Sequence, residues 1–251
     1  MTPLLLALGA SLAWGVADFV GPLWSRALGI LPVLLWAQVG GVLALLVVLG
    51  ARGEGPAGWA VLYAVGASFG GMLGLFAYYR GMVTGSMSVV APIAGVACAL
   101  VGVGLASVEH QEGRRKVAAG VGVALLAACG FGFYFPWMHA AGKVDFWWAS
   151  FVFRLTALLL VASVVAARRP PVRLSPRNVV IAGAVGIGDT IGNVLFAASS
   201  RTGLVSLTAV LASLYPVVTV LLAASILHER VASLQRAGIV LTLAGVVLIS
   251  V

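Results

Sequence analysis

The chain has 251 residues, of which 62% are hydrophobic and only 9% are charged. One apolar core with a wetted surface does not accommodate that proportion, so the composition excludes a soluble enzyme and a disordered chain and predicts an integral membrane protein. The net charge of +8 does not indicate nucleic-acid binding, because the 15 Lys and Arg residues lie almost wholly in short gaps between apolar runs.

Nine apolar runs are long enough to cross a bilayer, for which a helix needs about 20 residues. They cover residues 3–24, 31–50, 57–79, 84–107, 117–141, 146–167, 177–199, 203–227 and 233–251. The fifth run is predicted to be one long helix, because the uncharged stretch between Lys116 and Lys143 is too short for two spanning helices and a turn. The expected fold class is therefore all-α, a polytopic integral membrane bundle of about nine transmembrane helices.

Basic residues are distributed unevenly over the loops of this nine-span topology. One set of alternate loops holds only Arg26, Arg80, Lys143 and Arg201. The other set holds Arg52, Arg114, Arg115, Lys116, Arg168, Arg169, Arg173, Arg177, Arg230 and Arg236. Because Lys and Arg accumulate in cytoplasmic loops, this bias predicts a multi-pass protein of the cell's inner membrane with its N-terminus in the cytoplasm and its C-terminus outside.

The two halves of the chain show an internal repeat. A shift of 120 residues superposes several matching positions: Gly66 on Gly186, Leu75-Phe76-Ala77 on Leu195-Phe196-Ala197, Ser86 on Ser206 and Glu109 on Glu229. A slightly smaller shift pairs Gln38 with Arg154. We therefore predict a duplication in which spans one to four correspond to spans five to eight.

Four segments carry a resemblance to a known family. They are Leu12–Gly15 (LAWG), Ser206–Val218 (SLTAVLASLYPVV), His228–Arg230 (HER) and Leu243–Leu248 (LAGVVL). These segments resemble the EamA-type proteins of the drug/metabolite transporter (DMT) superfamily. The resemblance implies a permease built from two EamA-like repeats, here residues 1–113 and 114–251. Members usually have ten helices in two inverted five-helix repeats; this chain is about one helix short, so parallel and inverted repeats both remain open.

Three ionisable residues lie within predicted spans, where an unpaired charge costs roughly 2.5–3.5 kcal/mol or more. They are Asp18, Arg154 and Asp189. Arg154 keeps its proton, so it needs an acceptor, which we expect to be Asp189 or Asp18. Such an ion pair either opens when substrate or a proton arrives or fastens two helices permanently. Asp189 is accordingly a candidate proton site, and Arg154 is a candidate partner for an anionic substrate group.

Other polar and aromatic residues are expected to share this region. Asn193 follows Asp189 by one helical turn and Trp14 precedes Asp18 by one turn, while two tyrosines lie deep in their spans. The predicted substrate-binding residues are Trp14, Asp18, Gln38, Tyr134, Arg154, Asp189, Asn193 and Tyr215. Five aromatic residues near span ends are instead expected at the membrane interface: Tyr78, Tyr79, Trp137, Trp147 and Trp148.

Small residues form stripes on two spans that correspond under the repeat. The stripes are Gly66, Gly70 and Gly74 on the third span, and Ala184, Gly188 and Gly192 on the seventh. They predict close approach of neighbouring helices. No His and Cys residues have the spacing of metal ligands, so neither a metal nor a cofactor is expected.

The run Gly186-Ile187-Gly188-Asp189 raises an alternative, because it matches the motif that nine-helix intramembrane aspartyl proteases carry on their seventh helix. Those enzymes need a second carboxylate beside the first, whereas the sixth span offers only Asp145 at its edge. We therefore expect a non-enzyme, a secondary transporter of a small polar or amphipathic metabolite driven by protons or exchange. Its partners are that small molecule and membrane lipids, and a passive channel is the other alternative.

Overall fold

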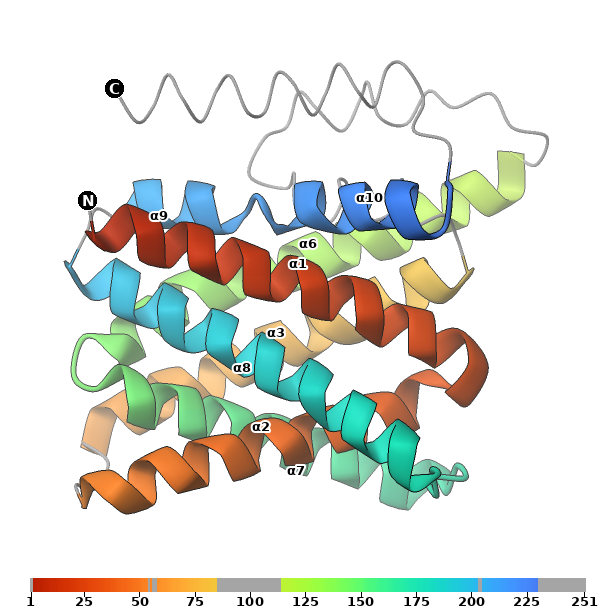
Figure 1. The fold of residues 1–251 in the computed structure, drawn as a ribbon. Helices are drawn as coiled ribbons and strands as arrows, with labels where there is room; N and C mark the ends of the chain where they lie inside the picture. Colours follow the sequence, from red (N-terminus) through yellow and green to blue (C-terminus); the bar gives the residue numbers. More distant parts are fainter. Residues whose placement is uncertain (1, 54, 56–57, 85–113, 203–204, 230–251) are drawn as a thin grey trace.

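The computed structural model describes residues 2–53, 55, 58–84, 114–202 and 205–229. They form a bundle of α-helices (Figure 1): α1 (Thr2–Leu28), α2 (Ile30–Arg52), α3 (Gly58–Thr84), α6 (Arg114–Gly142), α7 (Phe146–Arg168), α8 (Pro176–Thr202), α9 (Val205–Ala212) and α10 (Tyr215–Ile226). Six described segments are long and apolar enough to span a membrane: α1, α2, α3, α7, α8 and Leu207–Ile226. The chain is therefore a polytopic helical membrane protein; the predicted spans 84–107 and 233–251 lie outside the described residues.

Large apolar side chains cover the outside of the bundle. Val47 is 76% exposed and Leu62 and Val180 are each 70% exposed. In water such a surface would be a liability, whereas lipid tails solvate it. The polar residues accordingly gather inside, which is the reverse of a soluble protein.

The predicted fifth span is confirmed as one continuous helix, α6, which packs along α3. The glycine stripe of α3 makes this contact, because a Cβ at Gly66 would overlap the Trp137 ring and a Cβ at Gly74 would crowd Phe131. Residue numbers rise along α3 while they fall along α6, so the two helices are antiparallel. In the nine-span topology these two helices are the third and fifth spans and would run parallel. The structure contradicts this expectation, because α3 ends at the same end of the bundle at which α6 begins (Figure 1).

Helices α1 and α8 pack in the same antiparallel way. A Cβ at Gly192 would overlap the indole of Trp14, and Gly188 faces Ala17. At the end of this interface the Ser199 hydroxyl donates a hydrogen bond of 2.6 Å to the carbonyl of Pro3. The glycines of both predicted stripes thus lie in helix contacts, whereas Ala184, the remaining member of the stripe on α8, is exposed.

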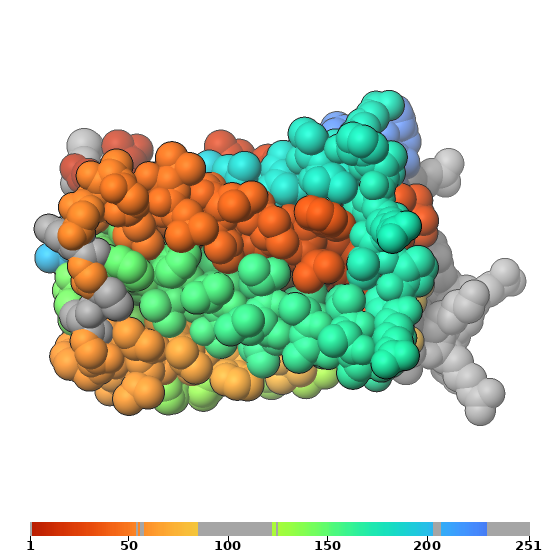
Figure 2. All heavy atoms as spheres, turned by 90° about the horizontal axis from the view of Figure 1, so that it is seen from below, coloured from red at the N-terminus to blue at the C-terminus, as the bar shows by residue number. Residues whose placement is uncertain are grey.

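Helices α2 and α7 lie side by side along another face of the bundle (Figure 2). The Trp36 indole donates to the carbonyl of Val172 at one end (3.0 Å), and Arg52 pairs with Asp145 at the other (2.7 Å). Asp145 also caps α7 by accepting from the backbone N–H groups of Trp147 and Trp148. These contacts make α2 and α7 antiparallel as well.

The predicted eighth span, residues 203–227, differs from one continuous helix. It is interrupted at Ser213 and Leu214, which separate α9 from α10. Pro216 has no N–H to donate to the carbonyl of Ala212, so the helical hydrogen-bond ladder fails at this point. The break places Tyr215 at the start of α10, facing the interior of the bundle.

Candidate functional site

A buried ion pair lies at the centre of the bundle. The guanidinium of Arg154 on α7 pairs with the carboxylate of Asp189 on α8. Its second terminal nitrogen donates a hydrogen bond of 2.9 Å to Oε1 of Gln38 on α2. Arg154 and Gln38 are completely buried. Gly41 makes room for them, because a Cβ there would crowd the Arg154 stem and overlap the Thr190 hydroxyl. One guanidinium therefore links three helices.

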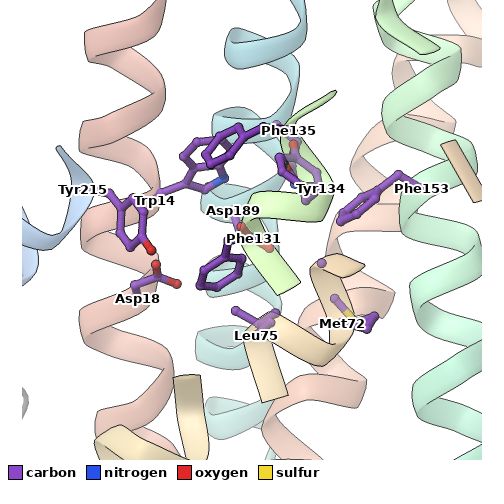
Figure 3. A pocket seen from close by; sticks show the side chains of 12 residues that line it. Trp14, Asp18, Met72, Leu75, Phe131, Tyr134, Phe135, Phe153, Asp189 and Tyr215 are labelled. Carbon is purple, nitrogen blue, oxygen red and sulfur yellow. Dashed lines mark hydrogen bonds between the residues drawn. The ribbon is translucent and has the colours of Figure 1, made fainter. Parts of the chain in front are cut away.

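A cavity opens beside this ion pair (Figure 3). It holds about 450 Å³ of space not filled by atoms, counting the part that opens outward. Twelve residues line it: Trp14, Asp18, Gly71, Met72, Leu75, Phe131, Tyr134, Phe135, Phe153, Asp189, Asn193 and Tyr215. The Asp189 side chain is 18% exposed, whereas the Arg154 side chain is fully covered. The carboxylate thus faces the cavity and the guanidinium lies behind it.

Six of the twelve lining residues are aromatic, and Trp14 contacts several of the rings. The ring centroid of Trp14 lies 5.9 Å from Phe196, 6.1 Å from Tyr134 and 6.3 Å from Tyr215. The contacts with the two tyrosines are edge-on, which is a preferred geometry for aromatic pairs. Packing of this kind holds the rings in fixed positions around the cavity.

Asp18 is the second acidic residue that lines the cavity. It is only 5% exposed, and its carboxylate and the Tyr215 hydroxyl point toward each other (Figure 3). The hydroxyl of Thr219 donates to the carbonyls of Gly15 and Tyr215, each at 3.1 Å, and this fixes α10 against α1. The interruption before α10 therefore positions Tyr215 against Asp18.

Asn193 contributes a polar edge to the same cavity. Its Oδ1 accepts a hydrogen bond of 2.5 Å from the Tyr134 hydroxyl. Its Nδ2 has no hydrogen-bond partner among the described residues, although Asn193 is only 3% exposed. Buried N–H groups are normally paired, so this donor is available to a molecule in the cavity.

The structure brings all eight predicted site residues into one cluster. Gln38 and Arg154 form its buried base, and the other six line the cavity. Of the two roles predicted for Arg154, the structure shows the pairing with Asp189.

Sequence reasoning missed six lining residues: Gly71, Met72, Leu75, Phe131, Phe135 and Phe153. A helix-face analysis that started from Tyr134 would have suggested Phe131, one turn away on α6. No comparable signal distinguishes an apolar residue that faces the cavity from one that faces lipid.

Tyr78 and Tyr79 are a further correction. They were expected at the membrane interface, but they are 0% and 2% exposed. The Tyr79 hydroxyl occupies the space that a side chain at Gly21 would fill. Because Gly21 has no side chain, the Tyr79 side chain of α3 can pack against α1.

The residues expected of an aspartyl protease are not paired with each other. Asp145 binds Arg52 at one end of the bundle, and Asp189 binds Arg154 at its centre. An aspartyl dyad shares one proton between two carboxyl groups, whereas each of these two acids is neutralised by an arginine. In the described part of the chain, no three His, Cys, Asp or Glu residues are grouped so that they could hold a metal ion.

Comparisons with known proteins place the chain among transporters. Residues 118–251, more than half of the chain, match the family described as the EamA-like transporter family. One solved structure, titled only "Crystal structure of protein", is similar with a TM-score of 0.69 at 20% sequence identity, over 97% of this chain and 94% of the other. That likeness shows a shared fold. No curated protein matches the chain.

Proposed function

The chain belongs to the EamA-like transporter family, and from this premise we propose that it is a secondary transporter of a small polar or amphipathic metabolite across the inner membrane. One observation carries the proposal: a buried charged cluster faces an aromatic cavity in the middle of apolar spanning helices. Charged groups are retained within a membrane where they serve a substrate or ion path.

The transport mechanism requires two units that move against each other, and we assign these to residues 1–113 and 114–251. Equivalent helices run in opposite directions: α1 and α6, α2 and α7, and α3 and α8 (Figure 1). Gln38 and Arg154, which correspond under the sequence shift, bind each other at 2.9 Å, as equivalent residues do near a two-fold axis. This supports inverted repeats. It also favours the five-helix repeat of the family over the four-helix repeat that nine spans imply.

The arrangement of helix ends supports a membrane orientation. One end of the bundle carries Arg52, Lys143 and Arg201. The opposite end carries Arg26, Arg80, Arg114, Arg115, Lys116, Arg168, Arg169, Arg173 and Arg177. The positive-inside rule assigns this basic end to the cytoplasm. The N-terminus would then lie outside, the reverse of the orientation inferred from nine alternating spans.

Reporter fusions test both topological proposals. Inverted five-helix repeats put the two termini on the same side, so reporters fused before Thr2 and after Val251 should both be active outside the cell. A C-terminal reporter in the cytoplasm together with an N-terminal one outside would restore an odd number of spans and parallel repeats. If both reporters were cytoplasmic, the inverted repeats would stand and only the proposed membrane orientation would be reversed.

Energy coupling is assigned to Asp189. Its carboxylate faces the cavity and is bound to the fully buried Arg154. A proton that reaches Asp189 competes with Arg154 for the carboxylate and weakens the link between α7 and α8. Under this proposal the ion pair opens during transport, and proton coupling or substrate exchange provides the driving force.

A ligand screen tests the transport proposal without knowledge of the substrate. A compound that binds the folded protein raises its unfolding temperature by mass action. We expect purified protein to be stabilised by a small metabolite, and the same compound to accumulate in proteoliposomes. Ligands that bind but never cross the vesicle membrane, or cleavage of a transmembrane peptide that depends on Asp189, would contradict it.

A further inference from the structure

The charges around the cavity are not balanced. Two carboxylates, Asp18 and Asp189, line it, and one guanidinium, Arg154, lies behind Asp189 without lining it. Within the described residues, no Lys or Arg lines this cavity. The surface that a ligand meets is therefore acidic, although the chain as a whole carries a net charge of +8.

Asp18 is the acidic residue of this cavity that has no ion-pair partner among the described residues. The only described ion pair at the site joins Arg154 to Asp189, and Asp18 faces the Tyr215 hydroxyl instead of a basic group (Figure 3). A cation that enters the cavity can pair with the Asp18 carboxylate as its counter-ion, whereas an anion is repelled by it.

Aromatic rings surround the position beside Asp18. Tyr215 lies next to it, and the Tyr215 ring contacts the rings of Trp14 and Phe131. Trp14 in turn contacts Tyr134. The faces of such rings attract cations, and the attraction increases in sites that exclude water. Met72, Leu75 and Phe153 complete an apolar wall for the rest of the ligand.

We propose that the cavity recognises a small organic cation, an ammonium group on an apolar or aromatic body, with Asp18 as its counter-ion and Trp14 and Tyr215 as the aromatic cage. This inference rests on the proposed transport function, since it names the substrate class of the same site. It assigns Asp18 to the substrate and leaves Asp189 to Arg154. The free Nδ2 of Asn193 binds an acceptor group elsewhere on the ligand.

Three probes that differ mainly in charge test the substrate class: 2-phenylethylammonium, 2-phenylethanol and phenylacetate. Binding is measured on detergent-purified full-length protein by calorimetry and by the shift in unfolding temperature. We expect the cation to bind about tenfold or more tightly than the neutral alcohol, a factor that corresponds to about 1.4 kcal/mol. Phenylacetate should bind most weakly. Tighter binding of phenylacetate, or equal binding of all three, overturns the cation proposal.

Variants test whether Asp18 is responsible for the preference for the cation. Asp18→Asn should weaken binding of the cation about tenfold or more and leave the binding of 2-phenylethanol within about twofold. Asp145→Asn is the matched control, because it removes the same charge at the end of the bundle, away from the cavity. Trp14→Leu should weaken the binding of the cation several-fold. If Asp18→Asn reduces the expression of folded protein, Asp18→Glu, which keeps the charge, should retain the preference for the cation.

Binding and transport are measured in separate experiments, so the transport proposal and the cation proposal can be contradicted independently. A cation that binds through Asp18 but is not taken up by proteoliposomes contradicts the transport proposal and supports the assignment of the cavity. Uptake of phenylacetate, with no binding of the cation, keeps the transporter and overturns the cation as its substrate.

Discussion

The two antiparallel interfaces, between α3 and α6 and between α1 and α8, share their backbone packing and differ in their chemistry. Glycines provide the close approach in both. The α3–α6 interface is filled by aromatic rings such as Phe131 and Trp137, whereas Asp18, Asp189 and Asn193 are on α1 and α8. The two interfaces thus share a mode of packing, and the polar side chains of the cavity lie on the helices of one of them.

Equivalent positions make the contrast sharper. The residues that correspond to Asp189 and Asn193 under the 120-residue shift are Phe69 and Leu73. Phe69 is 56% exposed and Leu73 is 49% exposed on the lipid-facing side of α3. The matching positions therefore face the cavity on α8 and the outside of the bundle on α3, where other residues, among them Met72 and Leu75, line the cavity.

The largest effect is expected from removing the acid of the ion pair. Asp189→Leu leaves Arg154 buried with a charge that it cannot lose, so the free energy of unfolding should fall by about 3–5 kcal/mol. Arg154→Met should cost less, because the cavity-facing carboxyl of Asp189 can take up a proton. Chemical unfolding in detergent measures both. Equal losses would indicate that Asp189 cannot exchange protons with the cavity.

The next effect concerns the two glycine stripes. Gly192→Val and Gly66→Val each insert a side chain into a helix contact, and each should destabilise the protein by about 1–3 kcal/mol. Gly192→Val displaces Trp14, which lines the cavity, and should also weaken ligand binding, whereas Gly66→Val displaces Trp137, which does not line it. Weaker binding in Gly66→Val by the same factor would show that the two interfaces do not differ in function.

The smallest effect is expected at the lipid-facing counterpart of the site. Phe69→Leu should change the free energy of unfolding by no more than about 0.5 kcal/mol, because Phe69 is exposed and both residues are apolar. Uptake should also remain unchanged. A large loss of uptake would mean that α3 contributes to transport through the face that the structure turns to lipid.

The site could be predicted from the sequence because buried charges need partners. Asp18, Arg154 and Asp189 interrupt otherwise apolar spans, and the cost of an isolated charge in lipid requires them to meet or to contact water. The continuous α6 followed from the charge-free length between Lys116 and Lys143 in the same way. Both inferences depend only on where charged residues lie along the sequence.

Other features depend on which faces meet, and hydropathy does not contain that information. The direction of α6 relative to α3 becomes evident only from the contacts of Gly66 with Trp137 and of Gly74 with Phe131. Tyr79 lies near the end of its span, which predicts an interfacial residue, and only the structure shows that it packs against Gly21. Phe131 and Phe133 are two residues apart on α6, yet Phe131 lines the cavity and Phe133 is 44% exposed. Their residue type alone gives no means to separate them.

The most direct test of the central role of Asp189 is pH-driven uptake into proteoliposomes by Asp189→Asn. The carboxamide oxygen still accepts a hydrogen bond from Arg154, so the variant should remain folded, as its unfolding temperature would show. Asp145→Asn is the control, since asparagine also caps helices well and its position is remote from the cavity. We expect uptake to be abolished in Asp189→Asn and retained in the control. Full uptake by a folded Asp189→Asn would remove this carboxylate from the transport mechanism.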